Sequence, residues 1–154
     1  NFPDFHSSEK NFQTLYKFLR LGSEGIIQTR LPEHPAISAL AKMDYEKFFL
    51  SEINLRQKEN FPPFVKLIKL VYKNPDEDNG HKESQKITQS LKSPNFSILG
   101  PSRPFFAKVR QNFRWQIVIK MTPNITHSEY YKLTETLTKL PKGWVIDVDP
   151  MNLL

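Results

Sequence analysis

Arginine, lysine and glutamine side chains gather in one stretch of this sequence. They are Arg103, Lys108, Arg110, Arg114, Gln116 and Lys120. Guanidinium and ammonium groups bind phosphate oxygens, and a glutamine amide can hydrogen-bond to a base or a sugar. This chemistry favours a polyanionic ligand, of which nucleic acid is the commonest. Such contacts follow the phosphate backbone, so we expect salt-sensitive binding without base-sequence readout.

The distribution of charge along the chain supports this prediction. The 154 residues carry 22 Lys and Arg against 16 Asp and Glu, a net charge of +6 with neutral histidine. Residues 1–60 hold eight bases and eight acids, so residues 61–154 carry the whole excess. Between Glu83 and Glu129 there is no acidic residue at all, although seven bases lie there. The positive charge therefore belongs to the second part of the chain.

Two strands are expected to position the basic side chains, one over 105–111 and one over 113–121. Side chains alternate between the two faces of a strand. This parity predicts that Lys108, Arg110, Arg114 and Lys120 lie on one side of the two strands. It also predicts that Trp115 faces the core and does not stack on a base. The alternative is a basic face that is solvated, paired within the chain or docked on a neighbouring domain.

The second part of the chain reads as a split β-α-β-β-α-β arrangement, an α+β fold of the ferredoxin-like type. Beside the two strands above, the expected elements are a strand over 65–72, a turn over 74–80, a weak helix over 81–92, a strand over 96–99, a helix over 128–140 and a strand over 144–149. Helices cover only one side of such a sheet. The other side is therefore available for a ligand.

The first part of the chain is mainly helical. Apolar spacing predicts a helix over 8–19 with Ser7 or Ser8 as its N-cap, a short strand over 25–29, a helix over 35–43 that begins at Pro35, and a helix over 45–59 capped by Asp44. The Pro62-Pro63 pair ends this pattern. We therefore expect a boundary near Phe61.

Catalytic motifs are missing from the sequence. The five glycines form no phosphate-binding nucleotide loop, and there is no nucleophile elbow around a serine. The four histidines have no metal-ligand spacing, and Asp147 and Asp149, which share a strand face, read as ion-pair partners rather than as a metal or acid–base pair. The lack of cysteine excludes disulfides and thiolate zinc sites, and it fits a reducing compartment. An autonomous enzyme is not expected.

Several stretches resemble primosomal protein N′, the family of PriA-type replication-restart DNA helicases of bacteria. They include Gly-Ile-Ile-Gln-Thr-Arg-Leu-Pro-Glu-His-Pro-Ala at 25–36, Phe-Pro-Pro-Phe at 61–64, Lys-Val-Arg at 108–110, Phe-Arg-Trp-Gln at 113–116 and Val-Ile-Asp-Val-Asp-Pro at 145–150. They follow the family's order over nearly the whole chain. The chain begins with Asn1 rather than Met. We therefore expect a C-terminal piece or a truncated relative.

The resemblance implies two domains. Residues 1–60 would be a remnant of helicase lobe 2 with its connecting helices, and residues 61–154 a C-terminal domain that binds DNA or docks on other proteins. Lys108, Arg110, Arg114 and Gln116 match the family's basic stretch, whereas Lys120 matches a less distinctive position. The implied partners are forked or single-stranded DNA, single-stranded-DNA-binding protein and other primosome proteins, in the cytoplasm and without a membrane.

The resemblance also implies what this chain lacks. At the place of the last helicase motif stand residues 16–24, which keep only Arg20 and Gly22. The ATP, magnesium and zinc sites of the full-length family would all lie upstream, so no cofactor is expected here. Two alternatives to DNA binding stay open. One is a docking module for the helicase core or single-stranded-DNA-binding protein, and the other is a non-functional remnant.

Overall fold

The computed structural model describes residues 4–22, 24–91 and 93–154. Lys92, at the end of one predicted helix, and Ser23, in the stretch at the place of the last helicase motif, lie outside the described residues. The chain forms two compact units, Asn1–Glu59 and Asn60–Leu154. The division between them lies next to the boundary expected at Phe61.

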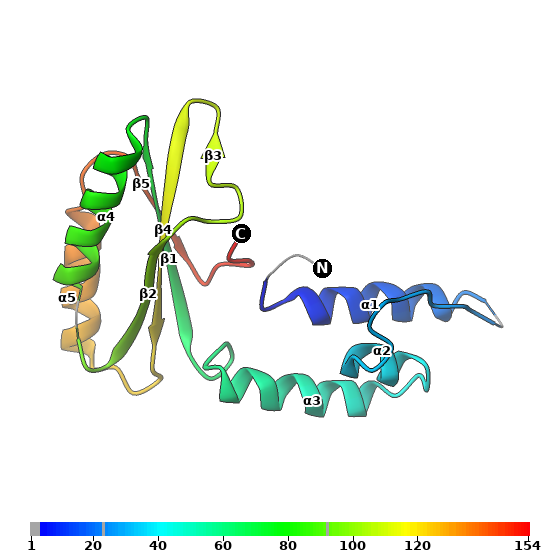
Figure 1. The fold of residues 1–154 in the computed structure, drawn as a ribbon. Helices are drawn as coiled ribbons and strands as arrows, with labels where there is room; N and C mark the ends of the chain where they lie inside the picture. Colours follow the sequence, from blue (N-terminus) through cyan, green and yellow to red (C-terminus); the bar gives the residue numbers. More distant parts are fainter. Residues whose placement is uncertain (1–3, 23, 92) are drawn as a thin grey trace. The chain divides into compact units, whose positions relative to one another are not determined.

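The first unit is a small helical assembly (Figure 1). It contains α1 (Ser7–Leu19), α2 (Pro35–Leu40) and α3 (Tyr45–Lys58). The rings of Phe12 and Phe48 stack at 4.0 Å between centroids and join α1 to α3. As predicted, Pro35 begins α2, and the Asp44 side chain caps α3 by accepting a hydrogen bond from the Lys47 backbone.

Three predictions for this unit were wrong. Residues 25–29 form no strand, because the described residues of the unit offer no second strand for a hydrogen-bonded ladder. The N-cap of α1 is His6, since the helix already begins at Ser7. The helix over 35–43 ends at Leu40, and the chain then turns through a left-handed Met43 with φ 51°.

The second unit is the predicted α+β fold. Its strands are β1 (Lys66–Asn74), β2 (Phe96–Ser102), β3 (Lys108–Val109), β4 (Asn112–Met121) and β5 (Trp144–Val148), and its helices are α4 (Glu77–Ser90) and α5 (His127–Thr138). The antiparallel sheet has the order β2-β4-β1-β5, with β3 added to β4. Leaving out β3, the order of elements along the chain is β-α-β-β-α-β. The ferredoxin-like prediction is confirmed.

Both helices lie on one face of this sheet (Figure 1). Alternate residues of β1 and β4 supply the core on that face, and Leu133 and Leu137 of α5 complete it. Trp115 is 8% exposed, and its Nε1 donates a hydrogen bond to the Glu77 carbonyl oxygen. The prediction that this indole faces the core is confirmed.

Helix α4 begins inside the stretch predicted as a turn over 74–80. The Asp76 side chain caps the helix by accepting a hydrogen bond from the Asn79 backbone. Gly80 then lies against the indole, where an added Cβ would be 2.9 Å from Trp115 Cδ1. The residue types that suggested a turn therefore have other roles. Asp76 caps the helix, and Gly80 allows the helix to lie close to the sheet.

Candidate nucleic-acid interface

The basic stretch begins at a bulge in β2. Gly100 has φ +105°, and an added Cβ would lie 2.6 Å from the Gln116 carbonyl oxygen. The register between β2 and β4 shifts between Leu99 and Ser102, next to this glycine. Beyond the bulge, residues 103–107 form a loop instead of a strand. The predicted strand over 105–111 is reduced to the two residues of β3.

Arg110 lies at the tip of the β3–β4 hairpin. Its φ of 55° is left-handed, a conformation that costs a residue with a side chain free energy. The side chain is exposed, and no described carboxylate lies within ion-pair distance of its guanidinium. Arg110 therefore presents an uncompensated charge at the end of the hairpin.

Lys108 does not share a face with Arg114, contrary to the parity argument. The register pairs Lys108 with Phe113, so these two side chains lie on the same face of the hairpin. The Lys108 ammonium lies 4.6 Å from the centre of the Phe113 ring, a cation–π contact. The prediction placed all four bases on one side because it did not include the two-residue turn at Arg110 and Gln111. This turn pairs Val109 with Asn112 and so puts Lys108 and Arg114 on opposite faces.

Two further bases hold the loop and the hairpin in place. Arg114 is half-buried, and its Nη1 donates to the Phe106 carbonyl oxygen at 3.4 Å. Arg103 is exposed, pairs with Glu77 and lies 5.7 Å from the centre of the Trp115 ring. Both guanidinium groups therefore have structural contacts as well as positive charge.

The remaining two predicted site residues are buried on the face of the sheet away from the helices. Gln116 is 6% exposed and Lys120 is 9% exposed. Gln116 Nε2 donates to the Leu153 carbonyl oxygen at 3.0 Å, and Lys120 Nζ lies 3.7 Å from the centre of the Phe61 ring. The last residues of the chain run along this face (Figure 1). This face of the sheet is therefore covered by the unit itself, and Gln116 and Lys120 are not on the surface.

Sequence reasoning missed Lys69, which fastens the C-terminal residues to the sheet. Its Nζ donates to the Asn152 carbonyl oxygen at 2.8 Å and lies 3.6 Å from an Asp147 oxygen. A lone lysine in the middle of an apolar strand was the available signal. Asp147 is thus an ion-pair partner, in agreement with the interpretation chosen from the sequence.

The described residues contain no group of three or more His, Asp or Glu that could hold a metal ion. No helix in the described part of the chain is long and apolar enough to cross a membrane.

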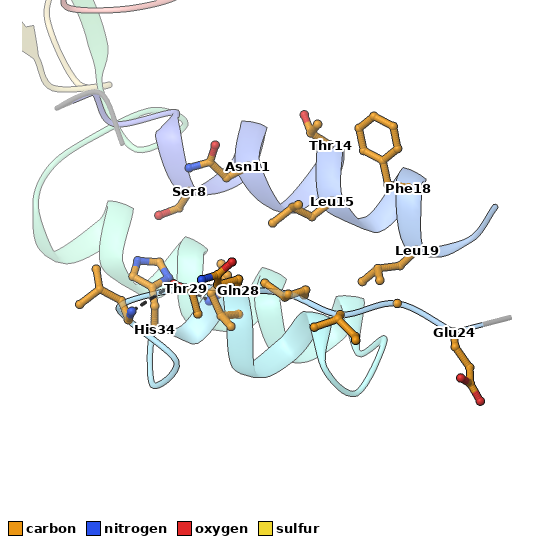
Figure 2. Close-up of a pocket in the computed structure, with 16 residues that line it drawn as sticks. Ser8, Asn11, Thr14, Leu15, Phe18, Leu19, Glu24, Gln28, Thr29 and His34 are labelled. Atoms are coloured by element: carbon orange, nitrogen blue, oxygen red, sulfur yellow. Dashed lines mark hydrogen bonds between the residues drawn. The ribbon is translucent and has the colours of Figure 1, made fainter. Parts of the chain in front are cut away.

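A hollow of about 620 Å³ lies in the first unit between α1, residues 24–31 and α2 (Figure 2). The titratable side chains in its lining are Glu24 and His34. His34 Nδ1 is occupied as the acceptor of the hydrogen bond that caps α2. Glu24 and His34 lie at opposite ends of the hollow in Figure 2 and so do not act on one another, and the basic hairpin of the second unit is the better candidate site.

Comparison with known proteins gives the family. The model of the primosomal protein N C-terminal domain matches residues 57–151. The chain belongs to this family. The match covers the whole sheet with α4 and α5, and it confirms the resemblance seen in the motifs.

Full-length relatives of the family extend the match to nearly the whole chain. The replication restart protein PriA of Synechocystis sp. is 31% identical over 99% of this chain, and that of Bacillus subtilis (strain 168) is 33% identical over 99%. That of Chlamydia pneumoniae is 33% identical over 97%. The chain covers 20%, 19% and 22% of these relatives. It therefore corresponds to the C-terminal part of bacterial replication restart proteins.

Proposed function

We propose that this chain binds forked or single-stranded DNA through the exposed bases of the β3–β4 hairpin and the loop before it. Arg103, Lys108 and Arg110 make the phosphate contacts, and Arg114 supports them from a half-buried position. Gln116 and Lys120 hold the C-terminal residues and Phe61 instead of DNA. The role is that of the C-terminal DNA-binding part of a replication restart protein.

One observation carries this proposal. The stretch between Glu83 and Glu129 contains no acidic residue, and three of its exposed bases, Arg103, Lys108 and Arg110, belong to the β3–β4 hairpin and the loop before it. Positive potential at such a point attracts phosphates. Among the described carboxylates, Glu77 alone lies within ion-pair distance of these three bases, beside Arg103. The replication restart relatives supply the context in which DNA is the expected polyanion.

The proposal includes no ATP hydrolysis by this chain alone. The sequence contains no nucleotide-binding glycine loop to hold the phosphates of ATP. In the full-length family, ATP, magnesium and zinc would belong to the upstream parts. An ATPase assay with and without single-stranded DNA tests this point, and turnover above the background rate would contradict it.

Fluorescence anisotropy with labelled forked, single-stranded and duplex DNA at low and moderate salt tests the proposed binding. We expect binding that weakens steeply with salt. Arg110→Asn removes the charge and retains a residue that tolerates the left-handed conformation, so it should weaken binding several-fold without unfolding the hairpin. Lys132→Gln on α5 is the matched control. An equal loss of DNA affinity in the two variants would contradict a binding site at the hairpin.

A docking function is the second candidate, favoured by the exposed edge of the sheet. Among the described strands, β5 pairs with β1 alone, and its Val145, Ile146 and Val148 side chains are exposed. Exposed apolar residues on an edge strand suit a protein partner. Val148→Lys should abolish such docking and leave DNA binding unchanged. A pull-down with purified single-stranded-DNA-binding protein and helicase core would separate the two functions.

A further inference from the structure

Two phenylalanine rings are exposed in the middle of the basic site. Phe105 and Phe106 lie in the loop between β2 and β3 and are 54% and 53% exposed. Their ring centres are 5.0 Å apart, and the ring planes meet at 89°. Exposed large aromatic side chains side by side on a folded unit indicate a binding surface more often than a lone exposed apolar residue does.

The loop that carries these rings is anchored to the sheet. Pro104 is buried at its start. At its end the Arg114 backbone N–H donates to the Ala107 carbonyl oxygen at 2.8 Å, and the Arg114 side chain donates to the Phe106 carbonyl oxygen. The backbone on both sides of the rings is thus held in position. The rings project from a fixed support, so little conformational entropy is lost when a ligand packs on them.

The charges around the rings select the ligand. Arg103 precedes the two phenylalanines by two residues, Lys108 follows by two, and Arg110 extends the basic surface to the hairpin tip. A ligand that matches both features has a chain of negative charges and planar apolar groups with free faces. Unpaired nucleotides have this chemistry, whereas the bases of a duplex have their faces covered by stacking.

We propose that Phe105 and Phe106 form a stacking platform for the unpaired bases of single-stranded nucleic acid. The phosphates on either side of the stacked bases lie against Arg103, Lys108 and Arg110. Trp115 lies close to these basic residues in the sequence, but its side chain is buried and cannot stack on a nucleobase. Arg114 acts as a positioning residue, because it holds the loop and not the bases. This inference rests on the proposed DNA binding and specifies its preference for single strands.

The experiment compares a labelled short oligothymidylate with an abasic oligonucleotide of the same length, which has the phosphates but lacks the bases. For the full chain we expect oligothymidylate to bind more tightly. Phe105→Ala/Phe106→Ala should weaken oligothymidylate binding at least about tenfold and leave binding of the abasic strand unchanged. Phe105→Leu/Phe106→Leu keeps apolar bulk and should show most of the same loss. Tyr131→Ala, an exposed aromatic residue on α5, is the control.

The outcomes separate the two proposals. Equal affinity of the intact chain for both strands, with no effect of the phenylalanine variants, would overturn the stacking platform and leave phosphate binding in place. No binding of either strand would overturn both proposals. Photocrosslinking of a 5-iodouracil strand, mapped by mass spectrometry, gives an independent readout that does not depend on a variant. Crosslinks at Phe105 or Phe106 support the platform, and crosslinks confined to other residues contradict it.

Discussion

Gln116 donates a hydrogen bond from its side-chain Nε2 to the backbone carbonyl oxygen of Leu153, 3.0 Å away. This bond joins the middle of the sheet to the end of the chain, and the Lys69–Asn152 bond runs beside it. Together the two bonds hold the C-terminal residues over the sheet face that ferredoxin-like folds leave without helices. In this unit the exposed basic side chains therefore lie at the hairpin and not on the sheet face.

Gln116→Glu should destabilise the second unit more than Gln116→Met. A glutamate places a buried carboxylate against a carbonyl oxygen, which costs about 2 kcal/mol or more, whereas methionine of similar size removes the polar atoms. The Oε1 atom of Gln116 is buried without a hydrogen-bond partner, so removing this atom in the methionine variant costs little stability. Urea unfolding followed by tryptophan fluorescence measures the difference. Equal unfolding free energies for the two variants would contradict the burial of this side chain against the Leu153 carbonyl oxygen.

Replacing Arg110 with glycine should leave the second unit as stable as before or raise its unfolding free energy by up to about 1 kcal/mol. Glycine adopts the φ of 55° without a steric penalty, although it gains entropy in the unfolded chain. Arg110→Val removes the same charge but places a β-branched residue in the left-handed region, so it should lower the melting temperature. Thermal unfolding by circular dichroism checks both. A valine variant as stable as the glycine variant would contradict the assigned turn.

Local sequence patterns were enough to predict much of the fold. The alternation of apolar residues in β4 gave the burial of Trp115, and the Asp44 cap gave the start of α3. Both features depend on side chains within one element or on strand parity. The family resemblance also came from short motifs of neighbouring residues, which recur in order along nearly the whole chain.

The sequence could not predict which face of the sheet is exposed. The bonds that cover it use the backbone carbonyl oxygens of Asn152 and Leu153, and every residue type carries such an oxygen. The position of Lys108 was wrong for a related reason. The two-residue turn at Arg110 and Gln111 pairs Lys108 with Phe113, and this register depends on backbone bonds between the strands rather than on the alternation within either strand.

The second unit should lose stability in acid through Glu129. Hydrogen bonds from the Thr126 side chain, the Asn95 amide and the Thr126 backbone hold the pKa of the Glu129 carboxyl below its ordinary value of 4.5. A lowered pKa in the folded state contributes stability above pH 4.5 that is lost as the pH falls through the lowered value. The melting temperature of Glu129→Gln should differ from that of the parent chain at neutral pH, and this difference in melting temperature should shrink towards pH 3. A difference that stays constant with pH would contradict this role.

Arg56 should hold the first unit together through its contacts with α1. Its Nη2 lies 2.8 Å from a Glu9 oxygen, and its Nε lies 2.9 Å from a Glu52 oxygen. Burial acts to raise the pKa of Glu9, but hydrogen bonds from His6 and Arg56 outweigh it and leave that pKa below its ordinary value.

Arg56→Ala leaves two carboxylates without this partner and should lower the unfolding free energy of the first unit by about 1–3 kcal/mol. Arg56→Lys keeps the charge but cannot reach both carboxylates with one planar fork, so its loss should be smaller. Denaturation followed by far-ultraviolet circular dichroism measures the helices. Tryptophan fluorescence is the control, because both tryptophans lie in the second unit. An unchanged helical transition in Arg56→Ala would show that Phe12 and Phe48 join α1 to α3 without help from this ion pair.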